Sequence, residues 1–397
     1  MTLRIIENAA ARKLGPYRMQ EVLSHAAAQT AYRMITACPR YAPTPLRALD
    51  RVAANAGLAA VWYKDESGRF GIGSFKALGG AYAVARLLQR RVAARLGHEV
   101  GVADLVRGGL RDITRTITVT CATDGNHGRS VAAGAQVFGC RCVIFLHRDV
   151  SAGREEAIRA FGAEIVRVDG NYDDSVHAAT RAAEEHGWEI VSDTSWPGYV
   201  DVPRDVMQGY TVMLIEALQQ LQTAGARRPT HVFVQGGVGG LAAAVCAHLW
   251  EEMGSEGPIT VVVEPERADC LYQSALAGRP APASGDLSTV MAGLSCGEVS
   301  TEAWRILCAG ARFFVTIDDA PAIAAMRLLA SGGAATERIV AGESATAGLA
   351  ALLAIAPETM LRQQLALGPD SSILLIGSEG ATDPALYREL VGDAAGA

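Results

Sequence analysis

The sequence predicts an α/β protein with two doubly wound domains and mainly parallel sheets, and three observations support this fold class. From about residue 117 onward, short β-branched segments alternate with helical segments that end in glycine. This alternation is typical of parallel strands joined by crossover helices. Half of the 397 residues are hydrophobic, which is enough for a large core. The 42 glycines gather inside apolar segments, as is typical of an Ala/Gly-rich α/β enzyme.

The expected elements follow one another closely along the chain. We expect strands at 117–123, 141–147, 164–169 and 189–193, with helices at 128–139, 152–162 and 173–187 between them. After a segment rich in proline and glycine (194–205), we expect a helix at 206–222, a strand at 231–235, a helix at 241–252 and strands at 259–265, 313–318 and 371–380. The weak periodicity of 266–300 indicates a loop region. The pattern predicts a discontinuous large domain (1–85 and 200–397) and a small domain (86–199).

Composition argues against several classes of protein. The chain has 36 basic and 42 acidic residues, and it lacks the basic stretch expected of a nucleic-acid binder. No stretch approaches the ~20 apolar residues of a membrane span, and the N-terminus lacks the apolar core of a signal peptide, so we expect a cytoplasmic protein. The eight cysteines form no C-x-x-C pair, so no metal site is expected. A disulfide between Cys270 and Cys296 is a separate hypothesis.

The first motif with chemical meaning is GRFGIGSFKALGGAYAV, residues 68–84. Ser74 is a candidate N-cap, which places Lys76 in the first turn of a helix. The positive end of the helix dipole disfavours a charged amine there, and a lowered pKa suits a lysine that forms a Schiff base. Taken alone, the segment favours a solvated lysine at a helix start.

The second motif is ATDGNHGRS, residues 122–130, between an expected strand and an expected helix. In doubly wound sheets, ligands bind at such strand ends. Asn126 offers a donor and an acceptor to a ring hydroxyl, and Asp124 adds a carboxylate to the same crevice. A helix-capping Asp-Gly-Asn turn explains the motif equally well.

The third motif is a glycine loop that joins an expected strand to an expected helix. Its backbone N–H groups and the helix N-terminus suit a phosphate. The loop comprises Gly236, Gly237, Val238, Gly239 and Gly240. The rival interpretation is a dinucleotide fingerprint, Gly237-x-Gly239-x-x-Ala242, with Glu264 as its acid. A fourth motif, IGSEG, ends in a strand-terminal Ser378 that suits a heteroaromatic nitrogen.

Together the four motifs provide a nucleophilic amine, a partner for a ring hydroxyl, a phosphate loop and a neutral partner for a pyridine nitrogen. Pyridoxal 5′-phosphate requires all four, and few other ligands do. The dinucleotide interpretation explains neither Lys76 nor Asn126. The sequence therefore predicts this cofactor, with Lys76, Asn126, the loop 236–240 and Ser378 as its binding residues.

The order of these motifs resembles the tryptophan-synthase-β (fold type II) family of pyridoxal-phosphate enzymes, and within it the diaminopropionate ammonia-lyases. The resemblance is carried by residues 64–84, 123–132, 170–176, 193–199, 207–210, 291–298 and 378–383, which span nearly the whole chain. It implies the elimination of ammonia from 2,3-diaminopropionate, giving pyruvate and two ammonia, in an enzyme that forms a homodimer.

The same resemblance implies roles for two carboxylates. Dehydratases of this fold resemble the pattern S-x-G-N-H with a small residue at x, where this chain has Asp124. A carboxylate there suits a cationic substrate amine, and as a base opposite Lys76 it would allow both enantiomers to react. Asp193 is a second candidate for binding the β-ammonium, although a turn-capping aspartate explains it equally well. A serine/threonine dehydratase, a β-replacement synthase, a nicotinamide oxidoreductase and an inactive relative are the alternatives.

Overall fold

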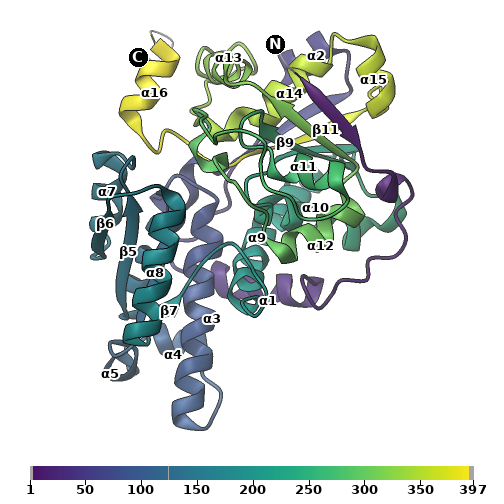
Figure 1. Ribbon diagram of the computed structural model, residues 1–397. Coiled ribbons are helices and arrows are strands. Elements are labelled where there is room, and N and C mark those ends of the chain that lie inside the picture. The colour runs from purple at the N-terminus through teal and green to yellow at the C-terminus, as the bar shows by residue number, and fades with distance from the viewer. Residues whose placement is uncertain (1–2, 124, 393–397) are drawn as a thin grey trace.

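The computed structural model describes residues 3–123 and 125–392, which form two β-sheets surrounded by helices (Figure 1). The larger sheet has seven strands in the order β1-β10-β9-β8-β11-β3-β2. Its five inner strands run parallel, and β1 and β2 join its two edges antiparallel. In the order of the sheet, the strands are β1 (Arg4–Glu7), β10 (Phe313–Ile317), β9 (Ile259–Pro265), β8 (His231–Gln235), β11 (Ser372–Gly377), β3 (Ala60–Asp65) and β2 (Leu46–Ala48).

The smaller sheet has four strands, all parallel, in the order β6-β5-β4-β7. These strands are β6 (Glu164–Val168), β5 (Arg141–His147), β4 (Thr118–Ala122) and β7 (Glu189–Ile190). The central strands β4 and β5 are almost wholly buried, because α6 (Asn126–Phe138) and α8 (Tyr172–His186) both pack against them. A parallel sheet covered in this way requires strands that are apolar on both faces, as these are.

The larger sheet separates two hydrophobic cores. Successive residues of a strand point to opposite faces. Val232 and Val234 of β8 therefore join the core that contains α9 (Asp201–Thr223) and α10 (Gly240–Met253), whereas Phe233 joins the core that contains α14 (Ala347–Ile355). The remaining α-helices are α1 (His25–Thr36), α2 (Asp50–Ala56), α3 (Lys76–Leu96), α4 (Val102–Val106), α5 (Arg111–Thr114), α7 (Ala152–Arg159), α11 (Cys270–Ala277), α12 (Thr301–Gly310), α13 (Asp319–Ala330), α15 (Thr359–Leu365) and α16 (Pro384–Val391).

The predicted α/β fold class is confirmed, and the alternating elements lie within a few residues of their expected bounds. Two expectations are wrong. The long helix expected at 206–222 begins earlier, at Asp201, because Pro203 lies in its first turn, where proline needs no N–H partner. The region 266–300 is not only loop: it contains α11 and a short 3-10 turn at Ala292–Leu294.

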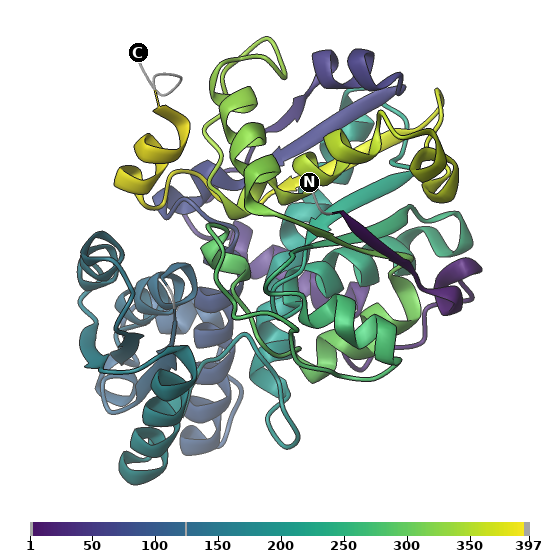
Figure 2. The same cartoon turned by 45° about the horizontal axis from the view of Figure 1, so that its top comes forward.

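The two sheets lie side by side, with α3 between them, in both views (Figures 1 and 2). All strands of the smaller sheet fall within 86–199, and all strands of the larger sheet fall outside that range. Helix α3 packs against both α6 and α9, so it joins the two parts of the molecule. The expected domain division at 85 and 199 stays a prediction.

Within the described ranges, no individual helix has both the length and the apolar character needed to cross a membrane. One sharply bent pair, Ser344–Ile355 with Thr359–Leu365, meets that test by length and composition only.

Candidate active site

Lys76 is the first residue of α3 and is placed by backbone contacts with the end of β11. The Phe75 N–H donates to the Ser378 carbonyl oxygen at 2.9 Å, and the Gly380 N–H donates to the Gly73 carbonyl oxygen at 3.0 Å. The lysine therefore lies beside Ser378, although 302 residues separate the two in the sequence. The helix starts one residue later than the proposed cap predicts, since Phe75 and not Ser74 is at the N-cap position.

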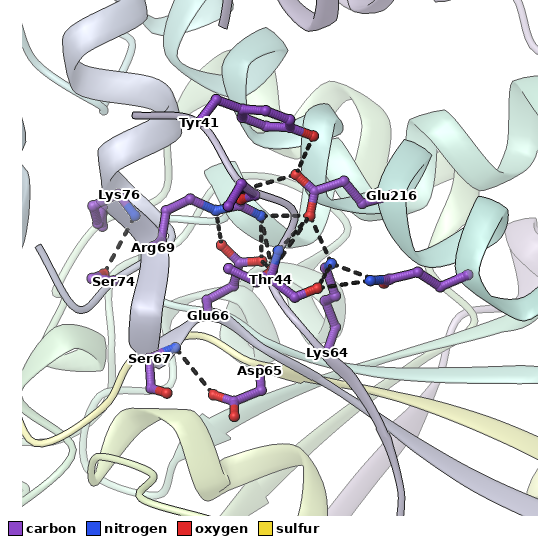
Figure 3. Close-up of polar contacts among 12 residues, drawn as sticks. Tyr41, Thr44, Lys64, Asp65, Glu66, Ser67, Arg69, Ser74, Lys76 and Glu216 are labelled. Atoms are coloured by element: carbon purple, nitrogen blue, oxygen red, sulfur yellow. Dashed lines mark hydrogen bonds and ion pairs between the residues drawn. The ribbon is translucent and has the colours of Figure 1, made fainter. Parts of the chain in front are cut away.

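A buried cluster of charges holds the segment that leads to Lys76 (Figure 3). Arg69 donates to Glu66 and to Glu216 of α9, both at 2.7 Å. Lys64 of β3 donates to the same Glu216 at 2.7 Å. All four side chains are buried, and their two positive and two negative charges balance. The cluster ties the 3-10 segment Glu66–Gly71 to α9, which forms one wall of the site.

The Lys76 ammonium is paired with the Asp193 carboxylate, which follows β7 of the smaller sheet. Burial favours the uncharged forms of both groups, but the opposite charge outweighs it, so the pKa of Lys76 is raised and that of Asp193 is lowered. The expectation of a lowered lysine pKa at a helix start is therefore wrong here. The helix dipole is the weaker influence, because a contacting carboxylate acts at much shorter range.

The His127 ring lies behind this ion pair. Its Nδ1 is 3.9 Å from the Asp193 carboxylate, and its Nε2 is 2.7 Å from the Val191 carbonyl oxygen. Burial lowers the pKa of His127, so the ring is neutral near pH 7. The neutral ring therefore adds no second cation beside Lys76, and its Nδ1 makes no hydrogen bond within the described residues.

The glycine loop connects β8 to α10 and has the backbone geometry that glycine permits. Gly237 and Gly239 have φ values of +63° and +100°, which residues with a side chain rarely adopt. A Cβ at Gly236 would lie 2.5 Å from the Glu264 side chain. Of the predicted loop residues, Gly239 alone does not line the cavity, and it faces Ala303 of α12 instead.

Glu264, the acid required by the dinucleotide interpretation, holds the start of a helix instead. Its carboxylate accepts hydrogen bonds from the Leu271 and Tyr272 N–H groups at 2.9 and 2.7 Å, at the start of α11. The side chain is wholly buried, so it presents no oxygen to a ribose. This contradicts the dinucleotide interpretation.

Asn126 opens α6 at the edge of the cavity, and its side-chain amide donates to Glu379. The Glu379 carboxylate also accepts from the Ser344 N–H at 3.3 Å. Ser378 is buried beside it at the end of β11. Asp124, the other carboxylate expected in this turn, lies outside the described residues.

One cavity brings most of the predicted residues together with several that the sequence did not single out. Among the missed residues are Tyr210, Gln235, Arg154 and Glu379. Both Glu379 and Tyr210 had a signal in the sequence. Glu379 follows Ser378 at a strand end, and Tyr210 is the last residue of segment 207–210, which carries the family resemblance, although its long apolar helix alone predicts a core residue. The predicted residues that line the cavity are Lys76, Asn126, Asp193, Gly236, Gly237, Val238, Gly240 and Ser378.

Side chains from the helices and loops beside the two sheets meet at the edge of this cavity. Arg154 of α7 donates to Glu343 at 3.1 Å, and the nearby Ser151 donates to Asp383 at 2.9 Å. Burial and the neighbouring Glu379 charge raise the pKa of Glu343 to about 7. These contacts hold α7 against the C-terminal part of the larger sheet.

The two cysteines of the disulfide hypothesis are not joined. Cys270 is buried at the start of α11, where its thiol lies 3.4 Å from the Gly237 carbonyl oxygen, and Cys296 is half-buried at the cavity wall. The polar loop expected around Cys270 is absent from this described part of the chain, because α11 begins there.

Comparison with known proteins then identifies the family. Residues 38–379 match the model of the family described as pyridoxal-phosphate dependent enzyme. This chain belongs to that family. A diaminopropionate ammonia-lyase from Escherichia coli strain K12 is 40% identical over 355 residues, which is 88% of this chain and 87% of the relative. The Salmonella typhimurium enzyme of the same name is 38% identical over 359 residues, 89% of each chain.

Solved structures show the same fold. The holo diaminopropionate ammonia-lyase from Escherichia coli matches with a TM-score of 0.89 and 36% identity, over 99% of this chain and 97% of that one. A threonine deaminase from Solanum lycopersicum matches with a TM-score of 0.71 at 19% identity, over 99% of each chain, and shows the fold alone. The predicted fold type II architecture and pyridoxal-phosphate cofactor are thereby confirmed.

The geometry of the cavity fits this cofactor. The Lys76 amine lies in the same cavity as a glycine loop at the start of a 14-residue helix, where N–H groups suit a phosphate. Ser378 and Asn126, the expected partners of the cofactor ring, line the same cavity. The Tyr210 hydroxyl is buried beside them and makes no well-formed hydrogen bond within the described residues.

Proposed function

We propose that this protein uses pyridoxal 5′-phosphate to remove ammonia from 2,3-diaminopropionate, with hydrolysis then giving pyruvate and a second ammonia. The observation that carries the proposal is the Lys76–Asp193 pair, which faces the glycine loop across one cavity. The relatives that match along most of this chain carry the name of this activity.

The bound cofactor would supply an electron sink for the carbanion that forms when the α-proton leaves. Lys76 would bind its aldehyde, the loop 236–240 its phosphate, Asn126 its ring hydroxyl and Ser378 its ring nitrogen. Because a serine hydroxyl is neutral, Ser378 adds a hydrogen bond without adding a charge. Of the loop residues, Gly239 contributes through the backbone turn alone, since it faces away from the cavity.

Asp193 gives the site its preference for a diamino acid. The carboxylate is already charged, because its pKa is lowered by Lys76, so it can accept the β-ammonium of the substrate. Without that partner the pKa of Lys76 would fall, so the ammonium would lose its proton to solvent and the neutral amine could then remove the α-proton. Asp124 is the proposed second base for the opposite enantiomer, and its presence would allow both D- and L-substrates to react.

A hydroxy amino acid is the second candidate substrate. One solved structure, 37% identical to this chain, is the Escherichia coli diaminopropionate ammonia-lyase in complex with D-serine. A hydroxyl group is neutral, however, so it gains less from Asp193 than an ammonium does. We therefore propose serine as a slower substrate or a competing ligand.

The test compares products for each substrate. Purified enzyme with bound cofactor is given L- or D-2,3-diaminopropionate, serine or threonine. Ammonia is measured together with the keto acid, which is pyruvate for diaminopropionate and serine and 2-oxobutyrate for threonine. Two ammonia for each pyruvate, formed faster from the diamino acid than from serine, supports the proposal. Faster pyruvate formation from serine would identify a dehydratase, and a required second nucleophile would identify a β-replacement synthase.

The oligomeric state and location belong to the same proposal. We propose a cytoplasmic homodimer, as the resemblance implies. Light scattering after size-exclusion chromatography tests the dimer, and a mass equal to one chain (41.6 kDa) would contradict it.

A further inference from the structure

Tyr210 of α9 is held at the junction of three helices. Its ring packs against Phe75, with 4.6 Å between the ring centroids. A Cβ at Gly79 of α3 would overlap the same ring, and a Cβ at Gly240 of α10 would lie 3.9 Å from it. The ring therefore fills a space that Gly79 keeps open, and packing fixes its orientation.

The hydroxyl group of Tyr210 is buried in this packing, where a polar group needs a hydrogen-bond partner. Tyr210 is 1% exposed, and its oxygen makes no well-formed hydrogen bond in the part of the chain that the structure describes, although the Lys76 amine is near enough to affect its titration. It lines the same cavity as Lys76 and Asp193. Burial raises the pKa of Tyr210, and the neighbouring Lys76 ammonium opposes that rise. Buried hydroxyls are seldom left unsatisfied, so this one calls for a functional explanation.

The charges at Asp193 explain why the Lys76 amine needs a second hydrogen-bond partner. In the structure its carboxylate binds the Lys76 ammonium. During turnover the substrate amine would replace Lys76 on the cofactor, and the substrate would bring a second ammonium to the same carboxylate. When the substrate engages Asp193, the lysine amine loses its partner. Phe75 offers the lysine only the face of its ring, at 5.5 Å, and the Nε2 of His127 already contacts Val191.

We propose that Tyr210 is a further catalytic residue: its phenol hydroxyl is the second hydrogen-bond partner of the Lys76 amine and holds that amine when substrate occupies Asp193. A phenol suits this task because it can accept from an ammonium and donate to a neutral amine. The inference rests on the function proposed above for Lys76 and Asp193.

The first test is Tyr210→Phe, which removes the hydroxyl and keeps the ring. We expect kcat for 2,3-diaminopropionate to fall by about 10- to 100-fold, the range of a hydrogen bond to a charged group, with KM changed less than about twofold. The matched control is Tyr82→Phe, which removes the hydroxyl of a buried tyrosine of α3 that does not line this cavity. This variant should leave kcat unchanged. An unchanged kcat in Tyr210→Phe would overturn the proposal.

The second test does not depend on turnover. Borohydride fixes the cofactor to Lys76, so peptide mass spectrometry measures how fast apo-protein captures it. With Asp193 intact, Tyr210→Phe should change this rate by less than about twofold. In the Asp193→Asn background the phenol is the remaining partner, and its removal should slow capture by about tenfold or more. Equal rates for Asp193→Asn with and without Tyr210→Phe would contradict the contact.

Two further outcomes are decisive. If the wild-type enzyme releases no ammonia from 2,3-diaminopropionate but the capture rates differ as expected, the proposed substrate is wrong and the Tyr210 contact stands. Gly79→Ala, whose added methyl group displaces the ring, should lower kcat in the same way as Tyr210→Phe. If neither variant folds, Tyr210 is a packing residue and the inference fails.

Discussion

Asp193 keeps the Lys76 amine charged. This effect cannot be predicted from the position of the lysine at the start of a helix. The local sequence around Lys76 predicts a lowered pKa from the helix dipole. The carboxylate that reverses this direction comes from a loop 117 residues later, and no local pattern shows that the two groups meet. A residue's titration is therefore decided by its neighbours in space.

The first prediction concerns this pair. Asp193→Asn removes the carboxylate but keeps the side-chain shape, so the pKa of Lys76 should fall and kcat for 2,3-diaminopropionate should drop by about 100-fold or more. The matched control is Asp205→Asn on α9, which breaks an ion pair with Arg90 of α3 outside the cavity and should leave kcat within about twofold. Steady-state pyruvate formation measures both variants, and equal activities would rule out the role of Asp193.

At the level of elements, the turn between β8 and α10 depends on backbone shape. Gly239→Ala introduces a side chain at a φ of +100° and brings its Cβ within 3.1 Å of Ala303. We expect the free energy of unfolding to fall by about 1–3 kcal/mol and cofactor affinity to weaken, because the loop must shift. Urea denaturation and absorbance titration with pyridoxal 5′-phosphate measure the two effects. Gly15→Ala, at an open position, is the control and should change neither.

Glu264 packs beside Gly236 of this turn, and its titration makes the stability of the protein depend on pH. Burial raises the pKa of Glu264 to about 8, against the hydrogen bonds from α11 that lower it. At pH values between about 4.5, the ordinary pKa of a glutamate, and about 8, Glu264 is protonated in the folded chain but ionised in the unfolded chain. The contribution of Glu264 to the free energy of unfolding therefore decreases as pH rises through this window.

Glu264→Gln cannot titrate, so its free energy of unfolding should decline less than that of the wild type between about pH 5 and pH 8. Urea denaturation at several pH values measures this slope. The exposed Glu358→Gln serves as control and should follow the wild-type slope. Parallel curves for Glu264→Gln and the wild type would show that the carboxyl group does not titrate in this range.

Sequence periodicity predicted the elements of the smaller sheet well, because each strand and each glycine-terminated helix is a local pattern. Gly139 and Gly187 end α6 and α8 in the left-handed conformation that the pattern predicts. The antiparallel edge strands β1 and β2 were missed, since each is short and its pairing depends on a distant partner. The same limit applies to Tyr210 in the site, whose role appears only when α3, α9 and α10 are packed together.

At the scale of the whole molecule, the cluster of Lys64, Glu66, Arg69 and Glu216 joins β3 and its following turn to α9. Glu216→Gln leaves two buried cations with one carboxylate, so the free energy of unfolding should fall by about 3–5 kcal/mol. The control is Asp370→Asn, which removes an exposed partner of Arg227 and should cost less than about 1 kcal/mol. Urea denaturation compares the two, and similar losses would mean that the buried cluster contributes no more than a surface pair.

The backbone contact between the Lys76 segment and the end of β11 has a consequence for synthesis. Residues 73–75 can take their final position only when residues 378–380 are available to pair with them. A nascent chain therefore carries its reactive amine for most of translation without the strand that orients it. The site is therefore completed only after β11 has left the ribosome.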